Sequence, residues 1–225
     1  MSNAVLIIGE SGSGKSTSIR NLIPTETFII NVLDKPLPFQ GFKNKYVRAT
    51  NGAMQGNYCA TDEHKFIIPL INIIDEKRPE IKNLIIDDFQ YIMSNEYMRR
   101  SKETGFTKYV DIGYNGWDII RRTTECRPDL NCFILSHSDI NANGKSVCKT
   151  IGKLLTEKIT LEGMFTIIFH SITMDGEYKF LTQNDGHHLA KSPMGLFKDN
   201  YIDNDLSEII PLINEYYSNI NENFL

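Results

Sequence analysis

Gly9-Glu10-Ser11-Gly12-Ser13-Gly14-Lys15-Ser16 is the segment from which the architecture of this chain can first be inferred. It follows the apolar run 4–8, which predicts a strand, and it leads into residues 17–22, which predict a short helix. The pattern G-x-x-x-x-G-K-S between a strand and a helix is that of the Walker A phosphate-binding loop. Glycines allow the backbone to curl so that successive N–H groups face a polyphosphate, and a following helix adds the positive end of its dipole.

The motif assigns a role to each residue of the loop. Lys15 can reach the β- and γ-phosphates of a nucleotide, and the Ser16 hydroxyl is placed to ligate Mg²⁺. A chance match in a chain of this length is expected on the order of once per hundred sequences, so a flexible Gly/Ser turn is the weaker interpretation. The residues expected to bind the nucleotide are Gly9, Glu10, Ser11, Gly12, Ser13, Gly14, Lys15, Ser16 and Thr17.

The composition is typical of one folded domain. The chain has 225 residues, of which 41% are hydrophobic and 23% are charged, and its net charge is −4. This length is ordinary for one α/β domain, so we expect a single domain spanning 1–225. The net charge disfavours a surface that binds nucleic acid throughout, but it permits a local basic loop.

Several function classes are disfavoured by the sequence. No stretch is apolar for long enough to span a bilayer, and the first strand begins near the N-terminus. These features predict a cytoplasmic protein with neither a signal peptide nor a membrane partner. The four cysteines lack C-x-x-C spacing, which favours reduced thiols over a zinc site.

The pattern of apolar residues predicts alternating strands and helices. Continuous apolar runs that end in polar residues indicate strands buried on both faces, and helical spacing indicates helices that pack on them. The alternation predicts an α/β fold with a mostly parallel sheet, helices on both faces and a small antiparallel addition near the C-terminus. We expect strands at 4–8, 27–32, 46–49, 84–86, 132–135, 166–169 and 178–181, helices at 17–22, 62–78, 90–102, 109–126 and 205–217, an irregular loop at 139–151 and a hairpin turn at 175–176.

Polar residues follow two of the buried strands. Asp87 ends the strand at 84–86, which is the Walker B position, and we expect it to hold Mg²⁺ directly or through water. Asp88 follows, where the additional-strand class of P-loop ATPases often has a Glu that orients the attacking water. His137 ends the next strand and is a candidate to sense the γ-phosphate. The alternative for both aspartates is a turn or helix cap, and for His137 a structural histidine.

Six segments together resemble a known family. They are Gly9 to Ser16, 84–91 with Asp-Asp-Phe-Gln-Tyr, 133–137, Gly-Lys-Leu-Leu at 152–155, Leu-Glu-Gly-Met-Phe at 161–165, and 182–195 with Lys-Ser-Pro-Met-Gly. In this order they resemble the bacteriophage RecA-like ATP-binding proteins, minimal recombinase cores related to the Sak-type single-strand annealing proteins. The resemblance covers most of residues 1–200. It implies a RecA-like P-loop NTPase fold and an ATPase (a hydrolase) with ATP and Mg²⁺ as ligands, in DNA recombination, annealing or replication.

The resemblance also implies partners. RecA-like cores assemble as homo-oligomers, as rings or filaments, and a phage protein would work in the cytoplasm of the bacterial host. They bind DNA through loops after the central strands, and the loop from Asp139 to Gly152 occupies that place, with Lys145 and Lys149 inside it and Lys153 at its edge. These cations could neutralise the backbone phosphates of single-stranded DNA, and an ordinary solvated loop is the alternative. Lys191 resembles the basic residue that recombinases insert at the γ-phosphate of a neighbouring subunit, and a simple turn is its alternative.

One departure from the family concerns the catalytic base. RecA places a catalytic Glu at the end of the strand after the phosphate-loop helix, whereas this strand runs into Asn31-Val32-Leu33-Asp34. Either Asp34 replaces that Glu, or Asp88 has the role, or turnover is slow; of the two aspartates we favour Asp88 as the base. Two other functions stay open: a small-molecule or nucleotide kinase, and an ATP-dependent loader or scaffold that barely hydrolyses ATP. The loop after His137 lacks the arginines expected of a kinase lid, which disfavours the first of these.

Overall fold

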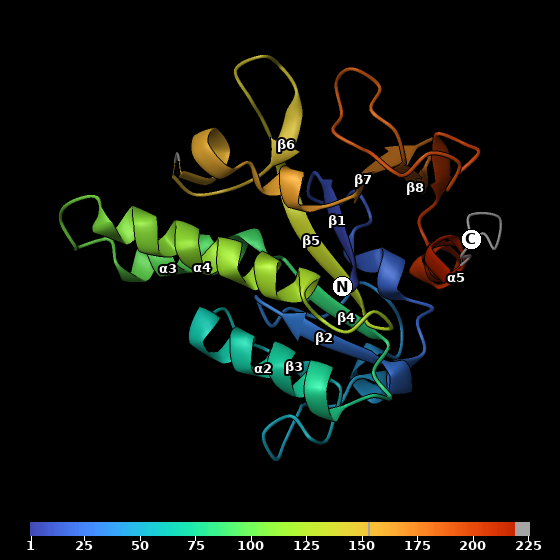
Figure 1. Ribbon diagram of the computed structural model, residues 1–225, viewed down its shortest axis with the longest axis horizontal. Helices are drawn as coiled ribbons and strands as arrows, with labels where there is room; N and C mark the ends of the chain where they lie inside the picture. Colours follow the sequence, from blue (N-terminus) through green and yellow to red (C-terminus); the bar gives the residue numbers. More distant parts are fainter. Residues whose placement is uncertain (153, 219–225) are drawn as a thin grey trace, which may run out of the picture.

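One mixed β-sheet runs through the centre of the molecule (Figure 1). The computed structural model describes residues 1–152 and 154–218. Within these ranges the sheet has nine strands, of which eight pair in the order β3-β2-β4-β5-β1-β7-β8-β9, and the ninth, β6, pairs with β5 outside this path. The pairs from β3 to β7 are parallel, whereas β5–β6, β7–β8 and β8–β9 are antiparallel. The strands are β1 Asn3–Gly9, β2 Thr27–Asn31, β3 Tyr58–Cys59, β4 Asn83–Asp87, β5 Asn131–Ile140, β6 Ser146–Cys148, β7 Ile167–Met174, β8 Glu177–Leu181 and β9 Tyr201–Asp203.

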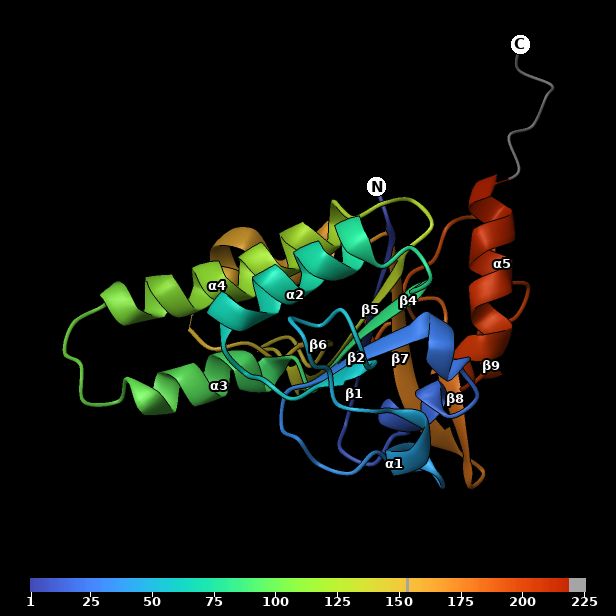
Figure 2. The same cartoon turned by 90° about the horizontal axis from the view of Figure 1, so that it is seen from below.

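Helices cover both faces of the sheet, as the sequence predicts. In β1, Leu6 and Ile8 belong to one buried cluster and Val5 and Ile7 to the other, because successive strand residues point to opposite faces. Helices α2, α3 and α4 pack on the first face, whereas η1 and α5 pack on the second (Figure 2). The helices are α1 Phe42–Lys45, α2 His64–Lys77, α3 Gln90–Arg99, α4 Thr107–Thr124 and α5 Leu206–Ser218, with 3₁₀ turns η1 Ser16–Ile19, η2 Pro24–Glu26 and η4 Leu161–Met164 and a π-helical turn η3 Leu154–Ile159.

The parallel strands bring several polar residues to one edge of the sheet. Strand β1 lies between β5 and β7, and β5 separates it from β4. In the register Gly9 lies opposite His137, and Asn31 lies opposite Asp87. The loop after β1 therefore lies at the same edge of the sheet as the carboxyl ends of β2, β4 and β5, and this is the edge at which open α/β sheets bind ligands.

Most of the predicted long elements are confirmed. The helices expected at 62–78, 90–102, 109–126 and 205–217 form as α2 to α5 and differ from the prediction mainly at their ends. Strands β7 and β8 form the predicted hairpin, and Asp175 and Gly176 in its turn have φ of 53° and 83°, as a type I′ turn requires. In the described part of the chain, no helix is both long and apolar enough to cross a membrane.

The helix expected at 17–22 is much shorter than predicted. Only the 3₁₀ turn η1 follows the phosphate loop. The Ser18 hydroxyl donates a hydrogen bond to the Lys15 carbonyl at 2.6 Å, and the Ser18 N–H is shared between the carbonyls of Gly14 and Lys15. Such local bonds compete with α-helical ones, which explains the tight turn. The helix dipole that the sequence predicts at this loop is correspondingly small.

Two other predicted segments are wrong. The irregular loop at 139–151 is in part a hairpin, because β5 continues to Ile140 and pairs with β6. The side chain of Asn141 accepts hydrogen bonds from the N–H groups of Asn143 and Lys145 at 3.0 Å each, which shapes the turn. The strand expected at 46–49 does not form, and only Arg48 makes an isolated bridge to Tyr58. The short strands β3 and β9 were not predicted.

Asp205 connects α5 to the segment that follows the phosphate loop. Its Oδ1 accepts hydrogen bonds from the N–H and hydroxyl of Ser207, which caps the helix as predicted. Its Oδ2 accepts a bond from the Asn21 amide at 2.5 Å and pairs with Arg20 at 3.2 Å. One nearly buried carboxylate thus fixes two segments that lie far apart in the sequence.

We expect Asp205→Ala to lower the free energy of unfolding by about 2 kcal/mol, because it removes a helix cap and a partly buried ion pair together. Asp205→Asn should lose less, since an amide oxygen still caps the helix. Chemical denaturation measures both. The control is Asp203→Ala, which removes an ion pair between Lys179 and a carboxylate that is 67% exposed and should change stability by less than about 0.5 kcal/mol. Equal losses at positions 203 and 205 would contradict the role of Asp205.

Candidate functional site

The phosphate loop curls as its sequence predicts. Gly12 and Gly14 adopt φ of 82° and 97°, which L residues rarely reach. The Lys15 ammonium donates hydrogen bonds to the carbonyls of Gly9 at 2.9 Å and Glu10 at 2.7 Å, so it lies in the mouth of the curl. Glu10, Ser11 and Gly12 form an exposed rim, Ser13, Gly14 and Lys15 are buried, and Ser16 and Thr17 are half-buried.

Ser16 and Asp87 come together from positions 71 residues apart. The Ser16 hydroxyl donates a hydrogen bond to Oδ1 of Asp87 at 2.9 Å. Asp87 is only 1% exposed, and its Oδ2 has no hydrogen-bond partner among the described residues. A hydroxyl and a carboxylate with an unused buried oxygen fit Mg²⁺, which binds hard oxygen ligands and takes its remaining ones from water and phosphate. Residues 1–152 and 154–218 contain no group of three or more His, Cys, Asp and Glu side chains that could hold a metal by itself.

Burial brings the pKa values of the two central charges towards neutrality. Desolvation lowers the pKa of Lys15 to about 8, although Asp87 and Asp88 oppose this shift. Desolvation and the charge of Asp88 raise the pKa of Asp87 to about 6. Each charge is therefore held at a cost, and ligands of opposite charge would relieve it.

Asp88 lies beside Asp87 but contacts different residues. Its Oδ2 is 2.5 Å from the Lys35 ammonium, and its Oδ1 is 3.6 Å from Nε2 of His137. Burial would raise the pKa of Asp88, but the contacts with His137 and Lys35 outweigh burial and lower it. Asp88 also adopts φ of 63°, a strained conformation for a residue other than glycine. The site thus holds Asp88 as a carboxylate in a fixed position.

Asp34, the other candidate base, lies elsewhere. Its carboxylate accepts a hydrogen bond from the Tyr58 hydroxyl at 2.9 Å and pairs with Arg48 at 2.5 Å. The hydrogen bond from Arg48 lowers the pKa of Asp34, and the side chain is 48% exposed. Of the two candidates, the structure brings only Asp88 into contact with a residue of the predicted site, His137.

His137 is positioned mainly through its backbone. Its N–H donates to the side-chain oxygen of Gln90 at 3.1 Å, and its carbonyl accepts from the N–H of Lys149. Gln90 also accepts a bond from the Ser136 hydroxyl at 3.3 Å, so a buried amide joins the ends of β4 and β5. The sequence analysis did not identify Gln90 or Lys35 as site residues. Gln90 could have been found from its place two residues after the second aspartate.

Lys191 does not lie at the phosphate loop of its own chain. Its backbone pairs with Ile168, the second residue of β7, and the register places Ile168 beside Leu6, three residues before Gly9. Burial lowers the pKa of Lys191, and the charge of Glu162 opposes this effect. The role predicted for Lys191 concerns a neighbouring subunit, so it stays a prediction.

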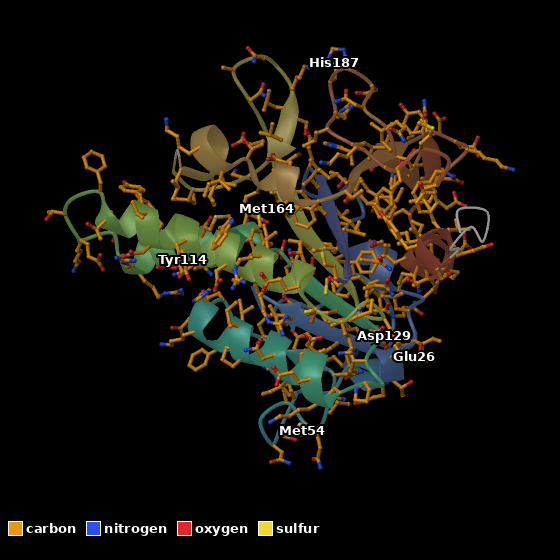
Figure 3. All side chains as sticks on the ribbon, viewed as in Figure 1. Glu26, Met54, Tyr114, Asp129, Met164 and His187 are labelled. Atoms are coloured by element: carbon orange, nitrogen blue, oxygen red, sulfur yellow. The ribbon has the colours of Figure 1, made fainter. Side chains whose placement is uncertain are left out.

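The predicted DNA-binding segment projects above the sheet edge. Lys145 and Lys149 on the β5–β6 hairpin are both exposed, whereas Lys153 lies outside the described residues. A second loop beside this hairpin carries His187, which is labelled in Figure 3. The carbonyl of His187 accepts a hydrogen bond from the N–H of Ser146 at 2.8 Å. Two projecting loops are therefore joined next to the phosphate loop.

A polar cavity of about 340 Å³ lies between these loops and the rim of the phosphate loop. His170 lies in its wall, 3% exposed, with its ring 4.6 Å from that of His188. Burial, with a smaller contribution from His188, lowers the pKa of His170 to about 4. The lining comprises Glu10, Ser11, Gly12, Ser13, Ser138, Ile140, Ser146, His170, Ser171, Ile172, Thr173 and His188.

In comparisons with known proteins, no protein-family model matches the chain, and a search of curated proteins finds no match either. The chemical meaning of the site therefore rests on its geometry. A curled loop with a buried ammonium, a hydroxyl and two carboxylates at one sheet edge can bind a phosphate chain together with a divalent cation.

Gly14 offers a test of the loop conformation. A Cβ at this position would lie 2.6 Å from Cγ of Tyr178, whereas one at Gly12 would meet no atom within 4 Å. Both glycines have positive φ, so alanine is strained at either. We expect Gly12→Ala to lower the free energy of unfolding by about 1 kcal/mol and Gly14→Ala by about 2–4 kcal/mol. Adding Tyr178→Ala to Gly14→Ala should remove the steric part in a double-mutant cycle, and additive losses would contradict the contact.

His170 should make the fold sensitive to acid. Its pKa in the folded state lies below the ordinary value of 6.5, so the unfolded chain takes up the proton more readily. The contribution is fully present above pH 6.5 and falls as the pH decreases towards 4. Between pH 7 and pH 4.5, the free energy of unfolding of His170→Asn should therefore fall by about 2 kcal/mol less than that of the wild type. His187→Asn, at a loop tip, is the control, and equal slopes in wild type and His170→Asn would contradict the prediction.

Proposed function

We propose that this protein is an ATPase that binds ATP and Mg²⁺ in its phosphate loop and acts on DNA. The observation that carries the proposal is the 2.9 Å contact between the Ser16 hydroxyl and the buried Asp87 carboxylate, next to the Lys15 ammonium. A Gly/Ser turn without function would have no reason to face a buried carboxylate from another strand. A phosphate loop needs one, because the metal that accompanies ATP requires oxygen ligands from both elements.

Each residue has a defined part in the proposed reaction. The loop N–H groups and Lys15 bind the β- and γ-phosphates, and Ser16 and Asp87 hold Mg²⁺. When bound, Mg²⁺ neutralises charge on these phosphates. Asp88 orients a water molecule and accepts its proton as the water oxygen attacks the γ-phosphorus. The bond from that phosphorus to the bridging oxygen breaks, and ADP and inorganic phosphate leave.

The order of the strands supports assignment to the RecA-like class. Strand β5 lies between β1, which carries the phosphate loop, and β4, which carries Asp87. An additional strand between these two is the arrangement that the name of the additional-strand class describes. We extend this resemblance to a phage-type recombinase core that works in the cytoplasm of a bacterial host. Its DNA partner would be single-stranded and would contact the β5–β6 hairpin through Lys145 and Lys149, which are exposed. In a ring or filament of identical subunits, Lys191 would reach the neighbouring γ-phosphate.

A second candidate is a kinase for a small molecule or nucleotide. The polar cavity beside Glu10 to Ser13 favours it, because an acceptor bound there would adjoin the loop that holds the phosphates. The lining of that cavity contains no arginine or lysine. Kinases usually use such cations to clamp the transferred group, so we rank this function below the ATPase.

We expect Lys15→Ala to lower the rate of ATP hydrolysis by at least about 100-fold, because it removes the cation that contacts the transferred phosphate. The fold should remain, since the substitution also removes a buried charge. The experiment measures phosphate release with and without single-stranded DNA, and light scattering under the same conditions measures assembly. DNA-stimulated turnover favours the recombinase core, slow turnover without stimulation favours a loader or scaffold, and phosphate transfer to a nucleoside favours a kinase. Hydrolysis by Lys15→Ala at the wild-type rate would contradict the site.

A further inference from the structure

Lys35 is held at the edge of the site by contacts on both sides of its backbone. The buried Asn31 side chain donates a hydrogen bond to the Lys35 carbonyl at 2.7 Å. The preceding residue, Asp34, adopts φ of 53° and is fixed in this conformation by Tyr58 and Arg48. A strained residue with two polar anchors is a costly way to build an ordinary loop. The arrangement fixes where the Lys35 side chain starts.

From this position the Lys35 ammonium reaches the edge of the sheet at which Asp87 and Asp88 lie. It lies 2.5 Å from Oδ2 of Asp88, and it is close enough to Lys15 that its charge contributes to the lowered pKa of that residue. The charges of both lysines also act on Asp87, so the two ammonium groups lie in the same small region. The Lys35 side chain is 46% exposed, whereas that of Asp88 is 3% exposed.

In the ion pair between Lys35 and Asp88, the Lys35 ammonium is thus the group that solvent or a ligand can reach. An ammonium has three donors, and the only hydrogen-bonding or ion-pair partner of its side chain among the described residues is Asp88. A lysine on a flexible stem can exchange one anionic partner for another with little rearrangement. A buried carboxylate cannot move in this way, because it is fixed at the end of a strand.

We propose that Lys35 is a second phosphate-contacting cation, which leaves Asp88 and binds the γ-phosphate when ATP occupies the loop. The inference rests on the proposed function. It gives the same chain a second cation, besides Lys15, for the charge that develops on the γ-phosphate during transfer. It also links ATP binding to activation of the base. When the γ-phosphate attracts Lys35, the Asp88 carboxylate is freed to accept the proton from water. ADP, which lacks that phosphate, leaves the pair between Lys35 and Asp88 intact.

Nucleotide selectivity separates this role from a structural one. Isothermal titration calorimetry with Mg²⁺ compares ADP with an ATP analogue whose β,γ-bridging oxygen is replaced by an imido group, so that no hydrolysis occurs. We expect Lys35→Met to weaken the triphosphate analogue by about 10-fold or more and ADP by less than about 2-fold. Lys35→Arg should restore part of the preference. Lys45→Met is the control, because Lys45 is an exposed lysine ten residues along the chain, and it should change neither affinity.

Asp88→Asn provides the converse test. Without the carboxylate, Lys35 is no longer held away from the phosphate, so this variant should bind the triphosphate analogue more tightly than wild type while its hydrolysis falls. Equal weakening of ADP and the analogue in Lys35→Met would show that Lys35 only supports the loop, and unchanged affinities would show that it does not touch phosphate. Either result overturns the inference. If wild type binds neither nucleotide, the proposed function itself fails, and the two failures are distinguishable.

Discussion

Asp87 is an almost wholly buried carboxylate at the tip of β4, within hydrogen-bond distance of the Ser16 hydroxyl, and the rest of the site is arranged around its charge. Burying a carboxylate is unfavourable unless it is paired, and Lys15, one of the two cations that act on Asp87, is itself buried. The two pKa values move towards each other, to about 6 for Asp87 and about 8 for Lys15. A folded chain that keeps two such groups close does so at the expense of stability, and this is typical of sites that bind a charged ligand.

The sheet supplies the rigidity that this arrangement needs. The carboxyl ends of β1 and β4 and the first six residues of β5 are buried, so the close packing of the core holds these segments in place relative to one another. The register places Gly9 beside His137, while the Gln90 amide joins Ser136 and the His137 backbone to the segment after Asp88. The loops that follow these strands are consequently positioned by the core rather than by their own contacts.

The sequence predicts the parts of the fold that are encoded locally. The phosphate loop, the aspartates after a buried strand and the Asp175-Gly176 turn each depend on a few adjacent residues, and each forms as expected. Local sequence patterns do not predict structure that depends on contacts between distant parts of the chain. Strand β6 forms because it extends the β5 hairpin, although the Asn143-Gly144 pair could have indicated the turn. The pair of Lys35 and Asp88 joins two strand ends 53 positions apart, and no local motif marks it.

Long-range contacts also distinguish the two candidate bases, Asp34 and Asp88, which the sequence leaves as alternatives. Asp34 and Asp88 both follow buried strands, and from the sequence we already favour Asp88 as the base. The chain folds Asp34 outward onto Arg48 and Tyr58, which leaves Lys35, the next residue, directed at Asp88. A base with a lowered pKa is weak, and its contacts with Lys35 and His137 are the reason for that weakness. Strengthening it requires that one of these contacts be lost, and Lys35, exposed and flexible, can leave at the least cost. In the proposed reaction, the turn after β2 therefore carries the side chain whose departure would strengthen Asp88 as a base.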